Sequence, residues 1–182
     1  MNNLLASIPP RDTSSGLVNV IIDTPRGSRN KFKFDEKLGC FKLGRILPAG
    51  FAFPYDFGSI PQTRAEDGDA IDVLVLGEAP SFPGCLITVR LIGVISARQT
   101  EKGKTIENDR LIGLPQTPAN KPRIRDLKRM DPDVVGQIEH FFVAYNEAQS
   151  RRFEPTRRSG PAKAMQLVEA AIRKYRAERG NG

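Results

Sequence analysis

Short apolar segments with the alternation of β-strands fill the first two thirds of this chain, and they constrain its fold more than any other feature. We expect strands at residues 17–22, 31–34, 40–47, 72–76, 85–95 and 110–114. Between them stand turn-forming pairs such as Asp67-Gly68 and Pro83-Gly84, whose backbone preferences suit tight connections. Such a pattern is typical of a meandering, mainly antiparallel β-barrel.

The last third of the chain changes to helical periodicity. After Asp131, which is suited to cap a helix, and Pro132, which is suited to its first turn, apolar residues recur at helical spacing as far as Tyr145. A second amphipathic segment follows Gly160-Pro161 and extends to Tyr175. Residues 151–160, between the two helices, predict a loop or a short strand. Strands followed by helices indicate an α+β fold.

The composition indicates one globular domain. The chain has 182 residues, of which 39% are hydrophobic and 27% are charged, which suits one folded unit with its own core. It contains no apolar run of about 18 residues and its N-terminus lacks the pattern of an export signal, so we expect a soluble, cytoplasmic protein. Its two cysteines suit reduced thiols in that compartment.

A formal charge of +7 favours an anionic partner, which could be phosphate, nucleic acid or a membrane surface. The aromatic residues near 51–57 could stack on bases, but tryptophan is absent and the aromatic residues stand where core residues are expected, so we regard nucleic-acid binding as unlikely. The pairs Arg151-Arg152 and Arg157-Arg158 could form a solvated surface, an oligomer contact or an anion site.

The strongest chemical signal is an aspartate-rich segment just before an apolar strand. Asp67 and Asp69 fall on one side of an extended chain, and a turn at Gly68 can bring Asp72 toward them. Three converging carboxylates would be stabilised by a divalent cation, and hard oxygen ligands suit Mg²⁺. The ordinary alternative is a solvated turn, because Asp-Gly is a common turn dipeptide.

The wider sequence resembles the family I soluble inorganic pyrophosphatases. The family signature, Asp-x-Asp-(Pro)-apolar-Asp, reads Asp67-Gly68-Asp69-Ala70-Ile71-Asp72 here, and the stretch Phe53-Pro54-Tyr55-Asp56-Phe57-Gly58-Ser59-Ile60-Pro61 precedes it. The match is collinear from about Val20 to Tyr145. Together with the periodicity, it implies a single α+β domain over residues 1–182, a mainly antiparallel five-stranded OB-like β-barrel flanked by two long C-terminal helices.

The resemblance also implies an activity, Mg²⁺-dependent hydrolysis of inorganic pyrophosphate to two phosphates by a metal-activated water. Asp69 would accept the proton of that water, and Asp67 and Asp72 would hold Mg²⁺, with Asp72 bridging two ions. Asp23 and Asn108 would be further residues of the metal site. The residues that would grip the phosphates are Lys31, Arg45, Arg110 and Tyr145. The family further implies a homo-oligomer, a hexamer in many bacteria.

Several family positions differ, and the differences concentrate at the site. Lys33 replaces a glutamate, Arg110 a lysine, Asn146 a lysine, and Phe53 and Phe57 tyrosines, while Asn108 and Thr100 replace metal-binding aspartates. A loop about two residues longer than usual leaves Glu101, Glu107 and Asp109 as alternative carboxylates. Taken at face value, the changes predict fewer or weaker metal ions. The alternatives are a weakened paralogue that binds a phosphate-rich ligand, or a hydrolase of another diphosphate or polyphosphate.

Overall fold

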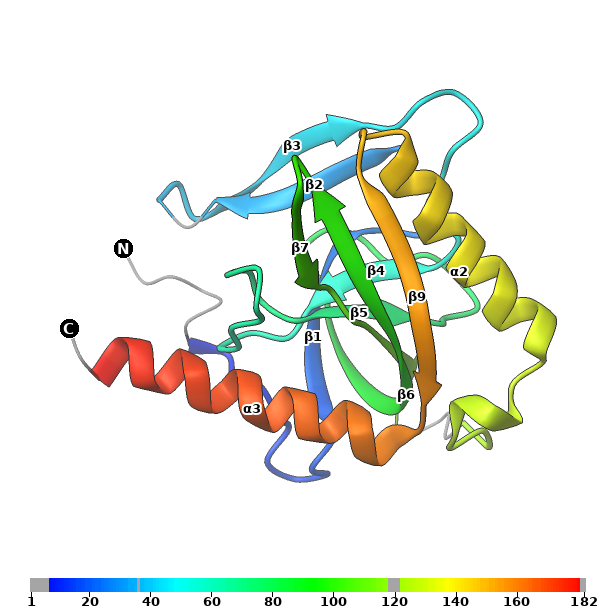
Figure 1. Cartoon of the computed structure of the whole chain (residues 1–182). Coiled ribbons are helices and arrows are strands. Elements are labelled where there is room, and N and C mark those ends of the chain that lie inside the picture. Colours follow the sequence, from blue (N-terminus) through cyan, green and yellow to red (C-terminus); the bar gives the residue numbers. More distant parts are fainter. Residues whose placement is uncertain (1–6, 36, 118–121, 181–182) are drawn as a thin grey trace.

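A computed structural model describes residues 7–35, 37–117 and 122–180 (Figure 1). The first six residues of the N-terminal segment that we considered for an export signal lie outside this described part. The strands are β1 (Val18–Thr24), β2 (Asn30–Asp35), β3 (Cys40–Ile46), β4 (Asp56–Ser59), β5 (Asp72–Val75), β6 (Leu86–Glu101), β7 (Lys104–Glu107), β8 (Arg110–Pro115) and β9 (Arg152–Ser159). The helices are the short 3-10 turn η1 (Leu127–Arg129), α2 (Pro132–Glu147) and α3 (Pro161–Gly180).

The strands form one mixed sheet and a separate hairpin. In the main sheet the order is β1-β4-β5-β8-β6-β7, with β9 added beside β6, and β1 also pairs with β6, so the pairings return to β1. All pairs are antiparallel except β5 with β8. The α+β class is therefore confirmed, whereas the OB-like barrel goes further than these pairings and stays a prediction.

The structure contains every strand expected from the sequence and adds two short ones. The additions are β4 and β7, and β6 continues six residues beyond the predicted end at residue 95. Strand β4 was missed because its four residues include Asp56 and Gly58, so apolar alternation is hidden, although three of the four are buried. Residues 152–159 are a full strand, the second of the two alternatives considered for this segment.

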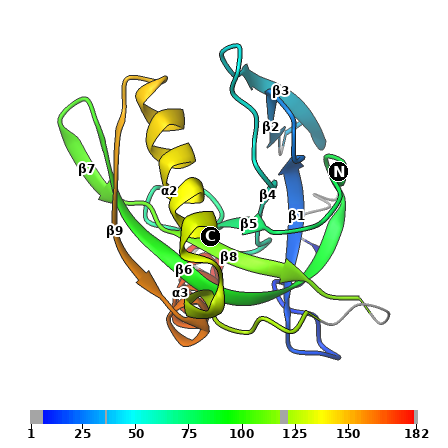
Figure 2. The ribbon, with the colours of Figure 1, turned by 90° about the vertical axis from the view of Figure 1, so that its right-hand side faces the viewer.

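Both predicted helices are confirmed, and each covers a different part of the core. Helix α2 begins as expected, with the Asp131 carboxylate accepting a hydrogen bond from the backbone N–H of Asp133 and with Pro132 in its first turn. It lies beside β9 in both ribbon views (Figures 1 and 2). Helix α3 packs against β6 and runs along the bottom of the molecule in Figure 1.

The core is divided between these two helices, and β5 contributes to both parts. Val73 and Val75 belong to the cluster under α3, and Leu74 belongs to the cluster under α2. This alternation follows from the period of two in a strand. Strand β5 is paired with a strand on each side. Its first residue, Asp72, therefore has a fixed position at the edge of the core.

The hairpin of β2 and β3 projects from the main sheet, at the end opposite α3 in Figure 1. Its strands pair from Asn30 with Ile46 to Asp35 with Cys40, and it is largely exposed. No helix of the described residues is long and apolar enough to cross a membrane.

Candidate active site

A pocket of about 510 Å³ lies between the β2–β3 hairpin, the segment before β5, the ends of β6 and β8, and α2. It is lined by every candidate site residue except Arg45, namely Asp23, Lys31, Asp67, Asp69, Asp72, Asn108, Arg110 and Tyr145. Candidate residues up to 122 positions apart in sequence thus meet at one cavity, from Asp23 in β1 to Tyr145 in α2. The fold therefore brings the acidic and the basic candidates together.

The acidic segment enters this pocket through a tight turn. Gly68 has a φ of +88°, a left-handed conformation that glycine adopts without strain. The Asp67 carboxylate accepts a hydrogen bond from the backbone N–H of Asp69 at 3.0 Å, and the Asp69 carbonyl accepts one from Ala65 at 2.8 Å. Asp67 thus caps its own turn, as aspartate often does, and the Asp69 side chain is left 64% exposed.

Asp72 lies deeper, and Arg110 neutralises it. The parallel pairing of β5 with β8 aligns Val73 with Leu111, so the residues just before them, Asp72 and Arg110, start neighbouring strands side by side. Their charged groups are 2.9 Å apart, with 25% of the Asp72 side chain and 7% of the Arg110 side chain exposed. Burial raises the pKa of Asp72, and the Arg110 guanidinium opposes that rise.

Asp23 is a second largely buried carboxylate of the site, and it lies beside Lys31. The Lys31 ammonium lies 3.8 Å from one of its oxygens, Oδ1, and this buried oxygen has no hydrogen-bond partner among the described residues. The pKa of Asp23 is raised to about 6, because burial and the neighbouring charge of Asp72 raise it more than Lys31 lowers it. This oxygen is therefore a good position for an additional cation.

The floor of the pocket is aromatic. The Lys31 ammonium lies 4.3 Å from the ring centre of Phe57, and the Arg110 guanidinium lies 5.2 Å from that of Phe142. Tyr145, which is nearly buried, packs edge-on against Phe53 with ring centres 5.5 Å apart. These rings attract the two cations without offering them an acceptor oxygen, which leaves the cations free to bind an anion or a carboxylate.

The oxygen donors of the pocket suit a hard divalent cation, although they do not converge on one point. They come from four aspartates and Asn108, and the orphaned Asp23 oxygen is one of them. Within the described residues, however, no three acidic side chains approach closely enough to share an ion. The expected convergence of Asp67, Asp69 and Asp72 is therefore not present in this structure, because like charges repel and each carboxylate has a nearer partner.

The substituted positions account for much of this arrangement. Lys33 pairs with Asp69 at 3.1 Å, and Asn108 accepts a hydrogen bond from Arg110 while donating one to Gln99 at 2.9 Å. Asn146 is buried and donates to the carbonyl of Phe142 at 2.8 Å. Thr100 does not line the pocket and its hydroxyl bonds that of Thr105.

The alternative carboxylates from the longer loop have different positions. Glu101 lines the pocket, but it forms an ion pair with Arg151 at 3.0 Å. The Asp109 carboxylate accepts a hydrogen bond from the backbone N–H of Ala97. Glu107 lies outside the main pocket and borders a smaller neighbouring one. Only Glu101 of the three thus has access to the main pocket.

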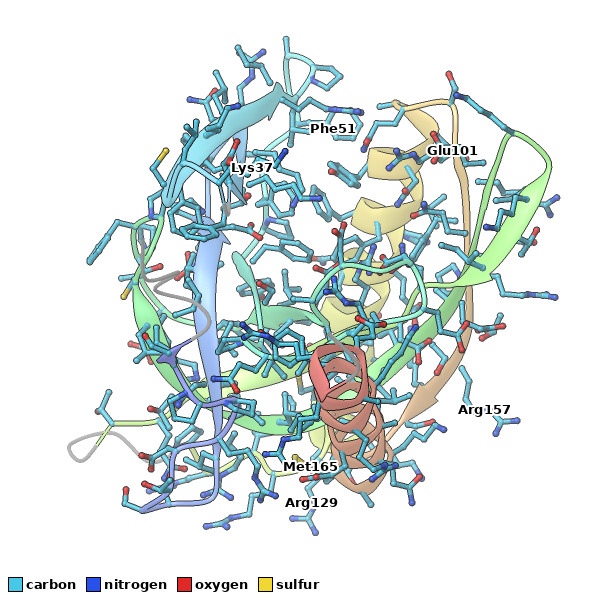
Figure 3. All side chains as sticks on the ribbon, turned by 90° about the vertical axis from the view of Figure 1, so that its left-hand side faces the viewer. Lys37, Phe51, Glu101, Arg129, Arg157 and Met165 are labelled. Carbon is cyan, nitrogen blue, oxygen red and sulfur yellow. The ribbon has the colours of Figure 1, made fainter. Side chains whose placement is uncertain are left out.

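The sequence did not identify Gln99 as a site residue, and it offered Glu101 and Arg151 only as alternatives, as a loop carboxylate and as part of an arginine pair. Gln99 is buried and holds Asn108, while Arg151 and Glu101 form an ion pair at the rim near the end of β6, where Figure 3 labels Glu101. Gln99 could have been found if β6 had been extended beyond residue 95, because a polar residue then interrupts a buried strand pattern. Arg151 follows a helix end and carries no comparable sequence signal.

The basic residues considered outside the pocket are either exposed to solvent or held in ion pairs. Arg45 lies opposite Lys31 in the hairpin but is exposed. Of the two arginine pairs, Arg152 and Arg158 bind Glu154 and Glu139, and Arg157 points away from the body of the molecule (Figure 3). This favours the solvated-surface interpretation for most of these arginines.

The fold and the pocket define an α+β protein whose site sets protein cations against a group of aspartates. Comparison with known proteins makes the class more specific. The family model described as inorganic pyrophosphatase matches residues 20–176. The chain belongs to the inorganic pyrophosphatase family, as its sequence resemblance predicted.

Individual relatives agree with this family over nearly the whole chain. An inorganic pyrophosphatase of Geobacillus stearothermophilus is 34% identical over 163 residues, which cover 90% of this chain and 96% of that protein. The crystal structure of the inorganic pyrophosphatase of Thermus thermophilus superposes with a TM-score of 0.84 at 34% identity, covering 94% of this chain and 98% of that one. An inorganic pyrophosphatase from Neisseria gonorrhoeae gives a TM-score of 0.83 at 30% identity.

Proposed function

We propose that this protein hydrolyses inorganic pyrophosphate to two phosphates with Mg²⁺. The observation that carries the proposal is that a single pocket gathers Asp69 with Lys31, Arg110 and Tyr145 in a member of this family. A diphosphate carries several negative charges, and a pocket with cations on an aromatic floor can offset them. The same family relation supports a cytoplasmic, homo-oligomeric protein with residues 1–182 as one domain, and a hexamer is our expectation.

Each candidate residue has a role that its position allows, and Arg110 would offset the charge of the phosphates from the aromatic floor. Lys31, at the pocket wall, would bind a phosphate oxygen, and Arg45, beside it on the hairpin, would reach the same anion from outside. The Tyr145 hydroxyl would donate a hydrogen bond to it. Asp69, which is the most accessible of the paired carboxylates, would accept the proton of the attacking water.

The residues that would hold Mg²⁺ are Asp67, Asp72, Asn108 and Asp23. Their oxygens are hard ligands, and the unpartnered Asp23 oxygen is the observation that best supports binding of a cation in this pocket. A bound divalent ion would supply charge to neutralise the diphosphate and would make water a stronger nucleophile near neutral pH. The protein contributes the position of the donors and excludes bulk water with the rings of Phe53 and Phe57.

Phosphate release from inorganic pyrophosphate tests the proposal directly. We expect release in the presence of Mg²⁺ and a loss of at least about 100-fold when the metal is removed by a chelator, because neutralising the diphosphate charge is a large part of this chemistry. The measurement is a colorimetric phosphate assay with pyrophosphate, tripolyphosphate and ATP compared in parallel. Failure to release phosphate from pyrophosphate with Mg²⁺, Mn²⁺, Co²⁺ or Zn²⁺ would contradict the proposal.

A second candidate function is binding of a phosphate-rich ligand with little turnover. The ion pairs of Asp69 with Lys33 and of Asp72 with Arg110 favour it, because both carboxylates already carry protein counter-charges. Calorimetry separates the two functions. Heat of binding with pyrophosphate or polyphosphate but no phosphate release would support the second, and Mg²⁺-dependent turnover would support the first.

A further inference from the structure

Two protein cations neutralise carboxylates of the pocket, one of them the proposed metal ligand Asp72 and the other Asp69, which lies between the proposed ligands Asp67 and Asp72 in sequence. The Lys33 ammonium lies 3.1 Å and 3.2 Å from the two oxygens of Asp69. The Arg110 guanidinium lies 2.9 Å from Asp72 and also donates to the side-chain oxygen of Asn108. The first pair joins the β2–β3 hairpin to the acidic turn before β5, and the second joins β8 to β5.

The two cations are held very differently. Arg110 is nearly buried, and besides Asp72 and Asn108 it contacts the rings of Phe142 and Phe153 with its guanidinium carbon 5.2 Å and 5.5 Å from their centres. It is therefore fixed in place. Lys33 is 71% exposed and its partner Asp69 is 64% exposed, so their pair is weak and can open when another charge arrives.

We propose that Lys33 and Arg110 are resident counter-ions of the acidic pocket, and that Lys33 is the positioning residue that sets how tightly the substrate-free site binds a divalent ion. In the substrate-free site, Arg110 pairs with Asp72 and donates a hydrogen bond to Asn108, which lowers the negative charge available deeper in the pocket. Lys33 reversibly neutralises Asp69, two residues from the proposed ligand Asp67. This proposal rests on the proposed function in assigning a divalent ion to this pocket.

The physical basis is the count of charges near the ion. Affinity for a divalent cation depends strongly on the number of charged ligands around it. The Lys33 ammonium, within 3.2 Å of Asp69, cancels a negative charge beside these ligands and repels the arriving ion. Removing that lysine should therefore tighten metal binding, even though it removes an attractive contact from the metal-free protein.

Calorimetric titration of the full-length protein with Mg²⁺, without any substrate, tests this inference. We expect Lys33→Met to bind Mg²⁺ about tenfold more tightly than the wild type, and Lys33→Glu to bind it more tightly still. Lys33→Arg keeps the positive charge and should retain the wild-type affinity. Lys37→Glu is the matched control, because it makes the same charge change in the exposed turn of the same hairpin, outside the pocket, and should alter the affinity less than about twofold.

The outcome is interpretable whatever the hydrolysis assay shows. If Lys33→Met and Lys33→Glu, both with wild-type unfolding temperatures, bind Mg²⁺ no more tightly than the wild type or Lys37→Glu, the inference is overturned. An equal gain in Lys33→Arg would also overturn it, because the charge would then not be the cause. If the expected gain occurs but no variant hydrolyses pyrophosphate, the proposed function fails while the counter-ion role stands.

Discussion

Replacing Asp69 with asparagine is expected to lower the rate of pyrophosphate hydrolysis by about 10²- to 10⁴-fold, the usual contribution of a general base. Asparagine keeps the size and shape of the side chain but cannot accept the proton of the attacking water. The side chain is exposed and its pair with Lys33 is a surface pair, so the loss of stability should be below about 1 kcal/mol. Initial rates at saturating pyrophosphate and Mg²⁺, with the unfolding temperature measured in parallel, give the result.

Asp133→Asn is the matched control for this prediction. Asp133 is exposed in the first turn of α2, and the pocket lining does not include it. We expect its rate to stay within about twofold of the wild type, because it lies among screened surface charges. If Asp69→Asn retained more than a tenth of the wild-type rate, another group would have to accept the proton, and the role of Asp69 would be withdrawn.

The sequence was sufficient to predict the elements whose signals are local. The helices α2 and α3 follow from apolar spacing over many residues, and the start of α2 follows from Asp131 and Pro132. The short strand β4 could not be predicted in the same way. Its strand character comes from pairing with β1 and β5 rather than from its own residues, so it depends on tertiary structure.

For the site, the sequence identified the residues better than their contacts. The family resemblance assigned Asp69, Asp72 and Arg110 to one site, and all three line the same pocket. Spacing alone suggested that the aspartates converge, whereas the structure pairs Asp69 with Lys33 and Asp72 with Arg110. That pairing depends on the hairpin folding over the acidic turn and on the register between β5 and β8, and neither is encoded within the acidic segment itself.

The same long-range packing underlies the second large effect that we expect, at Gly58 in β4. This strand lies between β1, which carries Asp23, and β5, which carries Asp72. A Cβ atom at Gly58 would lie 2.2 Å from the carbonyl oxygen of Ile21 and 2.9 Å from the Cα of Ile22. Both are backbone atoms of a paired strand, so they cannot move aside as a flexible side chain could.

We therefore expect Gly58→Ala to lower the free energy of unfolding by more than about 4 kcal/mol, at the severe end of single substitutions. Gly136→Ala in α2 is the opposite case, because its added Cβ meets nothing closer than 3.9 Å. Alanine is the better helix former, so this variant should gain up to about 1 kcal/mol. Urea unfolding followed by circular dichroism measures both. Equal urea midpoints for Gly58→Ala and the wild type would mean that β1 and β4 can move apart without cost. The close spacing of β1 and β4, which sets the distance between the strand of Asp23 and that of Asp72, would then not be a requirement of this fold.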